Sequence, residues 1–358
     1  MRKNIHKTGK LKTRYRVRNW AAYNAGLINR GNVTIWIDET VLARIPDAIP
    51  ARGRPCLYGD TLIQALLGVK TVYRLTLRAL QGFTQSLRDL AFPSLPVPNY
   101  TTLGRRAKTL DVELPILRDH EPIHLVVDST GLKVYGEGEW QVRQHGYSKR
   151  RAWRKVHLAL NANTGQVHAA LMTNQNVADG DALAKLLDQI PRETQIDVIG
   201  CDGAYDTKPC HAAIAARSAI PSIPPREGAA HWPADMPGAE WRNGAVDAIA
   251  RDGRREWKQE SGYYRRSLAE NAMYRFKTLT GNCPWARHID AQAAEVSVRV
   301  GVINRYGGGP RSSAIRSYRL KLSRRCYCVL TLDLCNNAPH RAYPLANERN
   351  PRVAESKE

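Results

Sequence analysis

Apolar residues recur at helical spacing between Tyr58 and about Leu110. The first run carries Leu62, Ile63, Leu66 and Leu67, and similar runs follow until the sequence LPVP at 95–98 interrupts them. Spacings of three and four residues place such side chains on one face of a helix. The pattern predicts a small helical region over residues 58–115.

The last helix of this region begins at the sequence PNYTT and is rich in basic residues. Its apolar positions face the predicted core, and Arg105 and Arg106 point mostly elsewhere. A helix of this kind can lie in a DNA major groove in helix-turn-helix fashion. The alternative is a basic surface that faces only solvent.

From residue 121 the pattern changes to short apolar runs. IHLVVDST is one such run, AWRKVHLALNA and QVHAALMT are two strands joined by the turn NANTG, and IDVIGCD is a further run. Helical segments and a charged insertion at about 226–260 come between and after them. This order of elements is typical of a ribonuclease H-like mixed sheet, so the predicted fold class is α/β over residues 121–305, preceded by the helical region.

Charge points to the class of partner. The 358 residues include 54 Lys and Arg against 33 Asp and Glu, which gives a net charge of +21. Such an excess favours nucleic acid, with a membrane surface as the weaker alternative. Neither a bilayer-spanning run of about 20 apolar residues nor a signal peptide is evident, so we expect a cytoplasmic protein with no membrane partner. Seven cysteines without CxxC pairs indicate reduced thiols.

Two apolar runs end in an aspartate. Asp128 ends HLVVD and Asp202 ends IDVIGCD, and neighbouring strands in the predicted sheet would bring the two carboxylates together. Either residue alone is more often a cap or turn residue. Buried carboxylates are costly unless a cation meets them, so the pair indicates a cation site. We expect Asp206, four residues further on, to cap a helix.

A third acid lies in YYRRSLAENAMYRFK at 263–277. On a helix, Tyr263, Arg266, Glu270 and Lys277 share one stripe, which taken alone is an ordinary solvated surface. Beside two strand-end aspartates, Glu270 completes three carboxylates that suit two divalent metal ions. Arg266 and Lys277 suit phosphates, and Tyr263 suits stacking on an unpaired base.

The spacing Tyr263-x2-Arg266-x3-Glu270-x6-Lys277 resembles the signature of insertion-sequence transposases of the DDE type. DSTGLKVYG, RRAWRKVHLAL, DGAYD and the helical region around GRPCLYGD and TTLGRRAKTL extend the likeness over roughly residues 14–305. The pattern is most similar to the family numbered five among insertion sequences.

The resemblance implies the catalytic chemistry and the partners. It implies that Asp128, Asp202 and Glu270 bind two divalent metal ions, Mg²⁺ or Mn²⁺, and that the enzyme cuts terminal inverted repeats and joins the 3′-hydroxyl ends to target DNA. It also implies double-stranded DNA as partner and a nucleoid-associated location. We expect a homo-oligomer, at least a dimer on DNA, because two ends must be held for paired joining.

The strand RRAWRKVH places cations beside an aromatic residue. Alternation puts Arg151, Trp153 and Lys155 on one face and Arg154 on the other. We interpret this strand as a DNA contact; the alternative is a sheet edge protected by charge.

The two ends of the chain are expected to differ from its middle. Residues 1–57 are predicted to form a basic arm, either a DNA contact or a solubilising tail, and 306–358 to form an atypical, flexible tail. Two other functions stay open. A DNA-binding repressor derived from a transposase would not need all three carboxylates, and a ribonuclease H-like nuclease would not explain the Tyr263 to Lys277 signature.

Overall fold

The computed structural model describes residues 13–17, 19–32, 37, 41, 57–116, 121–135, 152–307, 314–319 and 329–332. The chain divides into two compact units, one formed by residues 1–31 with 309–358 and the other by residues 32–308. The larger unit contains the predicted helical region and the predicted catalytic domain together.

The smaller unit pairs the two ends of the chain. It contains helix α1 (Trp20–Asn29) and a three-stranded sheet in the order β1-β7-β8, formed by β1 (Thr13–Val17), β7 (Ala314–Arg319) and β8 (Val329–Leu332). Strand β1 runs antiparallel to β7, and β7 runs antiparallel to β8. The predicted arm and the predicted tail therefore share one sheet.

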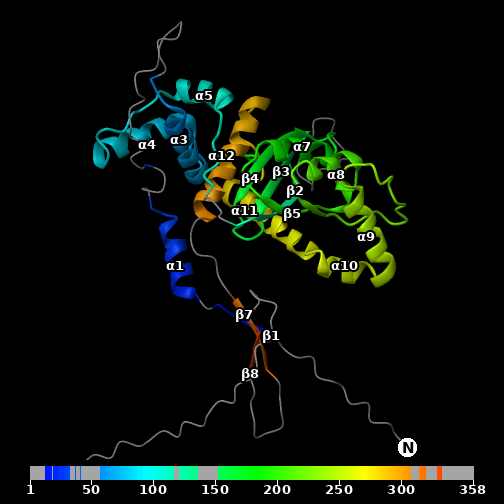
Figure 1. The fold of residues 1–358 in the computed structure, drawn as a ribbon. Coiled ribbons are helices and arrows are strands. Elements are labelled where there is room, and N and C mark those ends of the chain that lie inside the picture. The colour runs from blue at the N-terminus through cyan, green and yellow to red at the C-terminus, as the bar shows by residue number, and fades with distance from the viewer. Residues whose placement is uncertain are drawn as a thin grey trace, which may run out of the picture. The chain divides into compact units, whose positions relative to one another are not determined.

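The larger unit is built on a five-stranded mixed sheet in the order β4-β3-β2-β5-β6 (Figure 1). The strands are β2 (Ile123–Tyr135), β3 (Ala152–Asn161), β4 (Val167–Asn174), β5 (Ile196–Gly200) and β6 (Ile220–Ser222). Strands β2, β3 and β4 pair antiparallel, while β5 pairs parallel to β2 and to β6. The predicted hairpin and apolar runs are confirmed, and the mixed sheet is consistent with a ribonuclease H-like domain.

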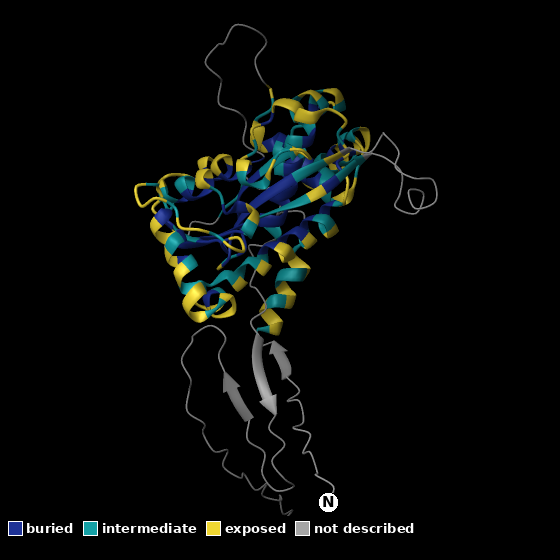
Figure 2. Ribbon diagram, turned by 90° about the vertical axis from the view of Figure 1, so that its right-hand side faces the viewer, coloured by how far each residue is buried: buried dark blue, intermediate teal, exposed yellow. Residues whose placement is uncertain are grey.

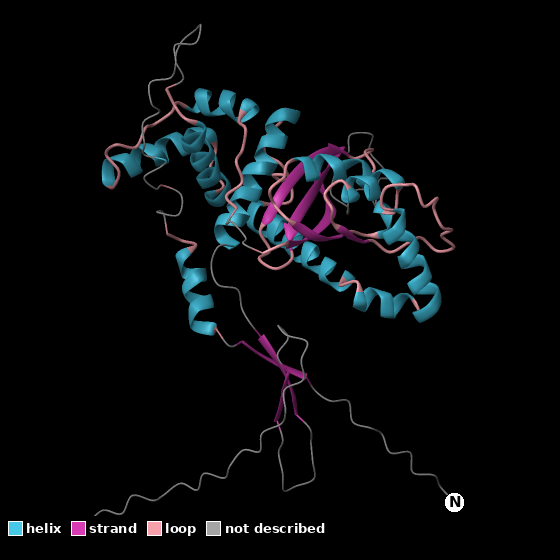
Figure 3. Cartoon of the chain, viewed as in Figure 1, coloured by secondary structure: helices cyan, strands magenta, loops and turns pink. Residues whose placement is uncertain are grey.

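Helices cover both faces of this sheet (Figure 3). One face packs on α7 (Asp179–Asp188) and α8 (Lys208–Ala215), and the other on α11 (Ser267–Thr280) and α12 (Ile289–Gly307). Alternation along β2 separates the layers, because Leu125 and Val127 join the α7 side and Val126 joins the α11 side. Asp128 therefore points to the side of α11. The sheet interior is buried and the outer helix faces are exposed (Figure 2).

Three helices form the predicted helical region: α3 (Asp60–Tyr73), α4 (Leu77–Leu90) and α5 (Tyr100–Thr109). Thr76 caps α4 by accepting the amide of Ala79, and Asn99 caps α5 by accepting the amide of Thr101. Their core continues onto Val298 and Val302 of α12. Helix α12 thus packs on the sheet with one face and on these helices with another.

The remaining elements follow strand β5. They are the 3₁₀ turn η2 (Gly203–Tyr205), helices α9 (Ala239–Asp252) and α10 (Arg254–Glu260), and the 3₁₀ turn η3 (Tyr263–Arg266). Helices α9 and α10 form much of the predicted insertion at 226–260. Within the described ranges, no helix has both the length and the apolar character needed to cross a bilayer.

Candidate active site

Asp128 lies inside a long strand, which corrects the expectation that it ends one. The parallel partner β5 stops at Gly200 opposite Val126, but β2 continues along β3 to Tyr135, with Asp128 opposite Leu158. The side chain therefore stands just beyond the end of β5, where the sheet leaves room on the α11 side. Its carboxylate also accepts the backbone N–H of Ser129 at 2.8 Å.

Asp202 follows β5 directly after the buried Cys201. Its carboxylate accepts the backbone N–H of Ala204 at 2.9 Å and begins the 3₁₀ turn η2. The predicted position after a strand is confirmed, and the residue also acts as a cap. A carboxylate that accepts one amide keeps acceptor capacity for a further donor or a cation.

Arg266 joins two of the predicted acids. Its Nη1 donates to Asp128 Oδ2 at 2.8 Å and its Nη2 donates to Glu270 Oε1 at 2.8 Å. The side chains of Arg266 and Asp128 are 21% and 17% exposed, whereas that of Glu270 is 61% exposed. Glu270 is therefore at the solvent edge of the cluster and Asp128 at its floor.

The expected single helix over 263–277 is interrupted. Tyr263–Arg266 form the 3₁₀ turn η3, and α11 begins only at Ser267. Gly262 precedes the turn at a φ of 68°, which favours glycine. Arg266 and Glu270 nevertheless keep the four-residue spacing that lets them interact. The predicted alignment is therefore kept for Arg266 and Glu270, but residues 263–277 do not form one continuous helix.

Tyr263 joins the cluster through its ring. The ring centroid is 6.2 Å from that of Trp257, and Lys258 Nζ and Arg266 Cζ lie 5.1 Å and 5.8 Å from it. Lys277 lies on α11 seven residues beyond Glu270, about 10 Å along the helix axis at 1.5 Å per residue. Contacts thus bring Tyr263, Arg266, Asp128 and Glu270 together, and Lys277 extends the same edge.

The pKa of Asp128 is set by contributions of opposite sign. Burial raises the pKa of Asp128, and the negative charges of Asp202 and Glu270 raise it further, while the Ser129 amide and Arg266 lower it. The net pKa is above its ordinary value, so the ionised form is under-compensated. The other two predicted acids therefore act electrostatically on Asp128.

These donors suit a hard divalent cation, because carboxylate oxygens are its preferred ligands. In the described part of the chain, however, no group of three or more His, Cys, Asp or Glu residues surrounds one possible metal position. The positive charge between Asp128 and Glu270 is the guanidinium of Arg266. The residue chemistry fits a metal, and these two acids are already bridged by a cation of the chain.

In the strand predicted to contact DNA, some side chains are exposed to solvent and others bond within the protein. Trp153 is 36% exposed. Lys155 Nζ donates to Val177 O at 2.8 Å and to Asp179 Oδ1 at 3.1 Å, so its charge is used within the protein. Arg154 Nη1 donates to the carbonyl of Trp153 at 3.3 Å. Arg151 lies outside the described residues.

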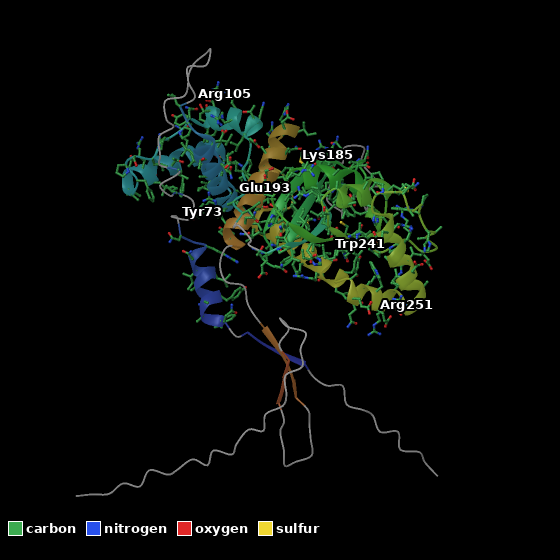
Figure 4. All side chains as sticks on the ribbon, viewed as in Figure 1. Tyr73, Arg105, Lys185, Glu193, Trp241 and Arg251 are labelled. Carbon is green, nitrogen blue, oxygen red and sulfur yellow. The ribbon has the colours of Figure 1, made fainter. Side chains whose placement is uncertain are left out.

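The two arginines of α5 also differ. Arg105 is exposed and is labelled in Figure 4. Arg106 donates to the carbonyl of Tyr58 and to Asp60 at the start of α3. Arg106 thus ties α5 to α3, and DNA contact by either residue stays a prediction.

Asp206 is not the helix cap that was expected. The helix α8 begins after Thr207, and Asp206 is buried against Arg242 of α9, whose Nε and Nη2 donate to its two oxygens at 3.1 Å and 3.4 Å. The backbone N–H of Arg226 donates at 3.1 Å, and His211 Nε2 lies 3.3 Å away. Sequence reasoning missed this cluster because Arg242 is 36 residues from Asp206 and nothing local links them.

Around this cluster the insertion is fixed to the core. The Arg242 guanidinium lies 4.2 Å from the ring centroid of Trp232, and the His211 ring meets Trp232 edge to face at 5.1 Å. Gly238 precedes helix α9 as its N-cap, where φ is 79° and a Cβ would approach His211 O to 2.8 Å. The available signal was the presence of three tryptophans, at 232, 241 and 257, in a charged segment.

The mixed sheet with helices on both faces is consistent with a ribonuclease H-like DDE domain, and the carboxylates of Asp202 and Glu270 act on that of Asp128 near one end of this sheet. Family models point to the same class of domain. Two models described as transposase DDE domain match the chain, one over residues 28–137 and the other over residues 119–296. Together the two matches span residues 28–296 and support a transposase of the DDE type.

Proposed function

We propose that the protein is the transposase of an insertion sequence of the family numbered five, and that it cuts and joins DNA at terminal inverted repeats. The observation that supports this most strongly is the convergence of Asp128 and Glu270 on one guanidinium, with Asp202 close enough to raise the pKa of Asp128. These residues come from three separate elements of a chain that matches transposase DDE domains.

In this proposal Asp128, Asp202 and Glu270 hold two divalent ions, Mg²⁺ or Mn²⁺. Bound there, the ions supply a polarised nucleophile and stabilise the leaving oxygen of an in-line phosphoryl displacement. Glu270 is the acid most free to change its position, since its side chain is the most exposed of the cluster.

Arg266 has two tasks in this proposal. Without DNA it neutralises Asp128 and Glu270. With DNA its fork of donors suits a phosphate at the scissile position, and Tyr263 beside it offers a ring for an unpaired base. Lys277 contributes a further positive charge on the same edge. These residues hold and orient the strand, and the charge of +21 favours its approach.

The experiment is cleavage of a labelled duplex that carries the ends of the flanking element, with and without Mg²⁺ or Mn²⁺. We expect cleavage at the element boundary for the wild-type protein, and a loss of at least about 100-fold for Asp128→Asn, Asp202→Asn and Glu270→Gln with DNA binding nearly unchanged. Glu240→Gln, on the exposed surface of α9, is the matched control.

Other results select the other functions. Tight and specific binding to the inverted repeats without metal-dependent cleavage would favour the repressor. Cleavage without joining of the 3′-hydroxyl ends, or without preference for the element boundary, would favour a ribonuclease H-like nuclease. Full cleavage by Glu270→Gln would show that this glutamate is not part of the metal site.

A further inference from the structure

A pocket of about 500 Å³ lies outside the carboxylate cluster, where α3, α5, the segment before α12 and α12 itself meet. Its lining is mostly apolar and includes Leu67, Ala107 and Val298. This volume is within the roughly 300–1,000 Å³ typical of small-ligand sites. The pocket joins the predicted helical region to the end of the DDE domain.

An exposed tryptophan stands in the wall of this pocket. Trp285 is 44% exposed, and Lys70 Nζ lies 4.5 Å from the centroid of its ring. Large exposed aromatic side chains are characteristic of binding surfaces, because they offer much apolar contact area with few rotatable bonds.

Side chains of α12 hold the backbone around Trp285 in place. Glu295 accepts the backbone N–H groups of Trp285 at 3.0 Å and of Ala286 at 2.8 Å. Arg299, only 1% exposed, donates to Glu295 at 2.5 Å and also to the carbonyls of Gly281 and Cys283. A buried ion pair does not by itself show that a protein is more stable. The pair of Arg299 and Glu295 does, however, hold the backbone of the loop that carries Trp285.

The rim of the pocket is cationic. Lys70, Lys108 and Arg287 line it, and Lys108 and Arg287 are exposed. Glu295, the acid of the lining, is already used by the two backbone amides and by Arg299. An apolar interior with an aromatic wall and a positive rim is complementary to a nucleotide, whose base is flat and apolar on its faces and whose phosphate is negative.

We propose that this pocket binds an unpaired nucleotide of the DNA, with the base in the apolar interior beside Trp285 and its phosphates at Lys108 and Arg287. The proposal rests on the proposed function, since it assumes DNA as the partner. It adds a second point at which the strand is held, between the helical region that the sequence predicts to contact DNA and the domain proposed to cut it. The choice of a nucleotide over an apolar side chain of a second copy follows from the three rim cations.

The test compares two fluorescent 12-nucleotide strands in EDTA, one of thymidines and one in which the central four sites are abasic. The two carry the same phosphates, so their affinity ratio reports base contacts alone. We expect the intact strand to bind roughly 5- to 100-fold more tightly. Trp285→Ala should lower this ratio at least about 5-fold, and Trp285→Phe should retain part of it.

Two further variants make the test specific. Trp241→Ala removes another exposed tryptophan, labelled in Figure 4 on α9, and should leave the ratio unchanged. Gly104→Leu fills the pocket while leaving Trp285 in place, because a Cβ at Gly104 already meets Leu77 Cδ1 at 3.4 Å. Gly104→Leu should lower the affinity ratio of the intact to the abasic strand as Trp285→Ala does. Because the two substitutions are at different positions, the test can still be made with one variant if the other fails to fold.

Failure of this inference and failure of the proposed function give different results. The proposed function would be contradicted if the protein bound neither single strand and also showed no salt-dependent binding to duplex DNA. Normal duplex binding with an affinity ratio that is the same in Trp285→Ala and Gly104→Leu as in the wild type would overturn the pocket alone. Loss of a dimer in Trp285→Ala during sedimentation, with the ratio intact, would assign the pocket to a second copy and also overturn the proposal.

Discussion

Asp128 and Asp206 lie at the same end of one sheet and each accepts a hydrogen bond from an arginine, yet their pKa values move in opposite directions. Burial raises the pKa of Asp128, and the nearby Asp202 and Glu270 add to the rise. At Asp206 burial also opposes ionisation, but donors from His211, Arg242 and the Arg226 amide lower the pKa to about 2. The number of donors and of like charges decides the outcome.

This difference separates a structural carboxylate from one suited to chemistry. Asp206 is 6% exposed and its donors satisfy it completely. Among the residues that the structure describes, Arg266 is the arginine paired with Asp128 and Glu270, while Asp202 adds a further negative charge beside Asp128, so the pKa of Asp128 stays above its ordinary value. A site with this added negative charge gains from a further cation, whereas the Asp206 site does not.

Of the variants that test the difference between the Asp128 and Asp206 sites, Arg242→Met is expected to have the largest effect. Removing the guanidinium leaves Asp206 buried without its main partner, and the free energy of unfolding should fall by about 3–5 kcal/mol. Urea unfolding followed by circular dichroism measures this loss.

Arg192→Met is the matched control for that measurement. Arg192 pairs with Asp188 at 3.7 Å, but both side chains are more than two-thirds exposed, so the loss should stay within about 0–1 kcal/mol. Equal losses for the two variants would show that the Asp206 cluster does not hold the insertion to the core.

The second effect is a pH dependence that belongs to Asp206. Its pKa falls from 3.8 to about 2 on folding, so it stabilises the folded state above pH 3.8 and this contribution disappears as the pH falls through about 2. The full contribution is about 2 kcal/mol at 1.36 kcal/mol per pKa unit.

The measurement is the free energy of unfolding of the wild type and of Asp206→Asn between pH 2 and 6. The gap between the two curves should narrow as the pH falls below about 4. A gap that stays constant or widens in acid would contradict the depressed pKa and with it the account of Asp206 as a fully compensated carboxylate.

Sequence periodicity predicted the elements whose signal is local. The alternation in 152–161 and the turn NANTG predicted the hairpin of β3 and β4, and the spacing of Leu62, Ile63 and Leu66 predicted α3. Asp128 and Asp202 were found because each follows an apolar run, and a continuous apolar run is enough to indicate a buried strand.

Other features depend on residues far apart in the chain. The pairing of Asp206 with Arg242, and of Lys155 with Asp179, requires the fold before the partners are known. The break between η3 and α11 leaves the helical spacing of Arg266 and Glu270 intact, so periodicity cannot detect it. Strand β2 extends past Asp128 because β3 continues to pair with it after β5 has ended.

The smallest effect concerns the charge balance at Asp128 itself and is measured as a shift of pKa. Arg266 lowers this pKa and Asp202 raises it. Arg266→Gln should therefore raise the pKa of Asp128 further, and Asp202→Asn should lower it. Because the Arg266 cluster opens to solvent at Glu270, Arg266→Gln should reduce the free energy of unfolding by no more than about 1 kcal/mol.

Carbon-13 NMR of labelled aspartate carboxyls in metal-free buffer measures these shifts, with the Asp128 signal identified by its loss in Asp128→Asn. Asp206, whose donors are not altered in either variant, is the internal control and should keep its pKa. Opposite shifts at Asp128 with a constant Asp206 would establish that its ionisation depends on a balance between one arginine and the neighbouring acids. No shift in either variant would mean that burial alone sets the pKa, and the argument that this cluster lacks positive charge would fail.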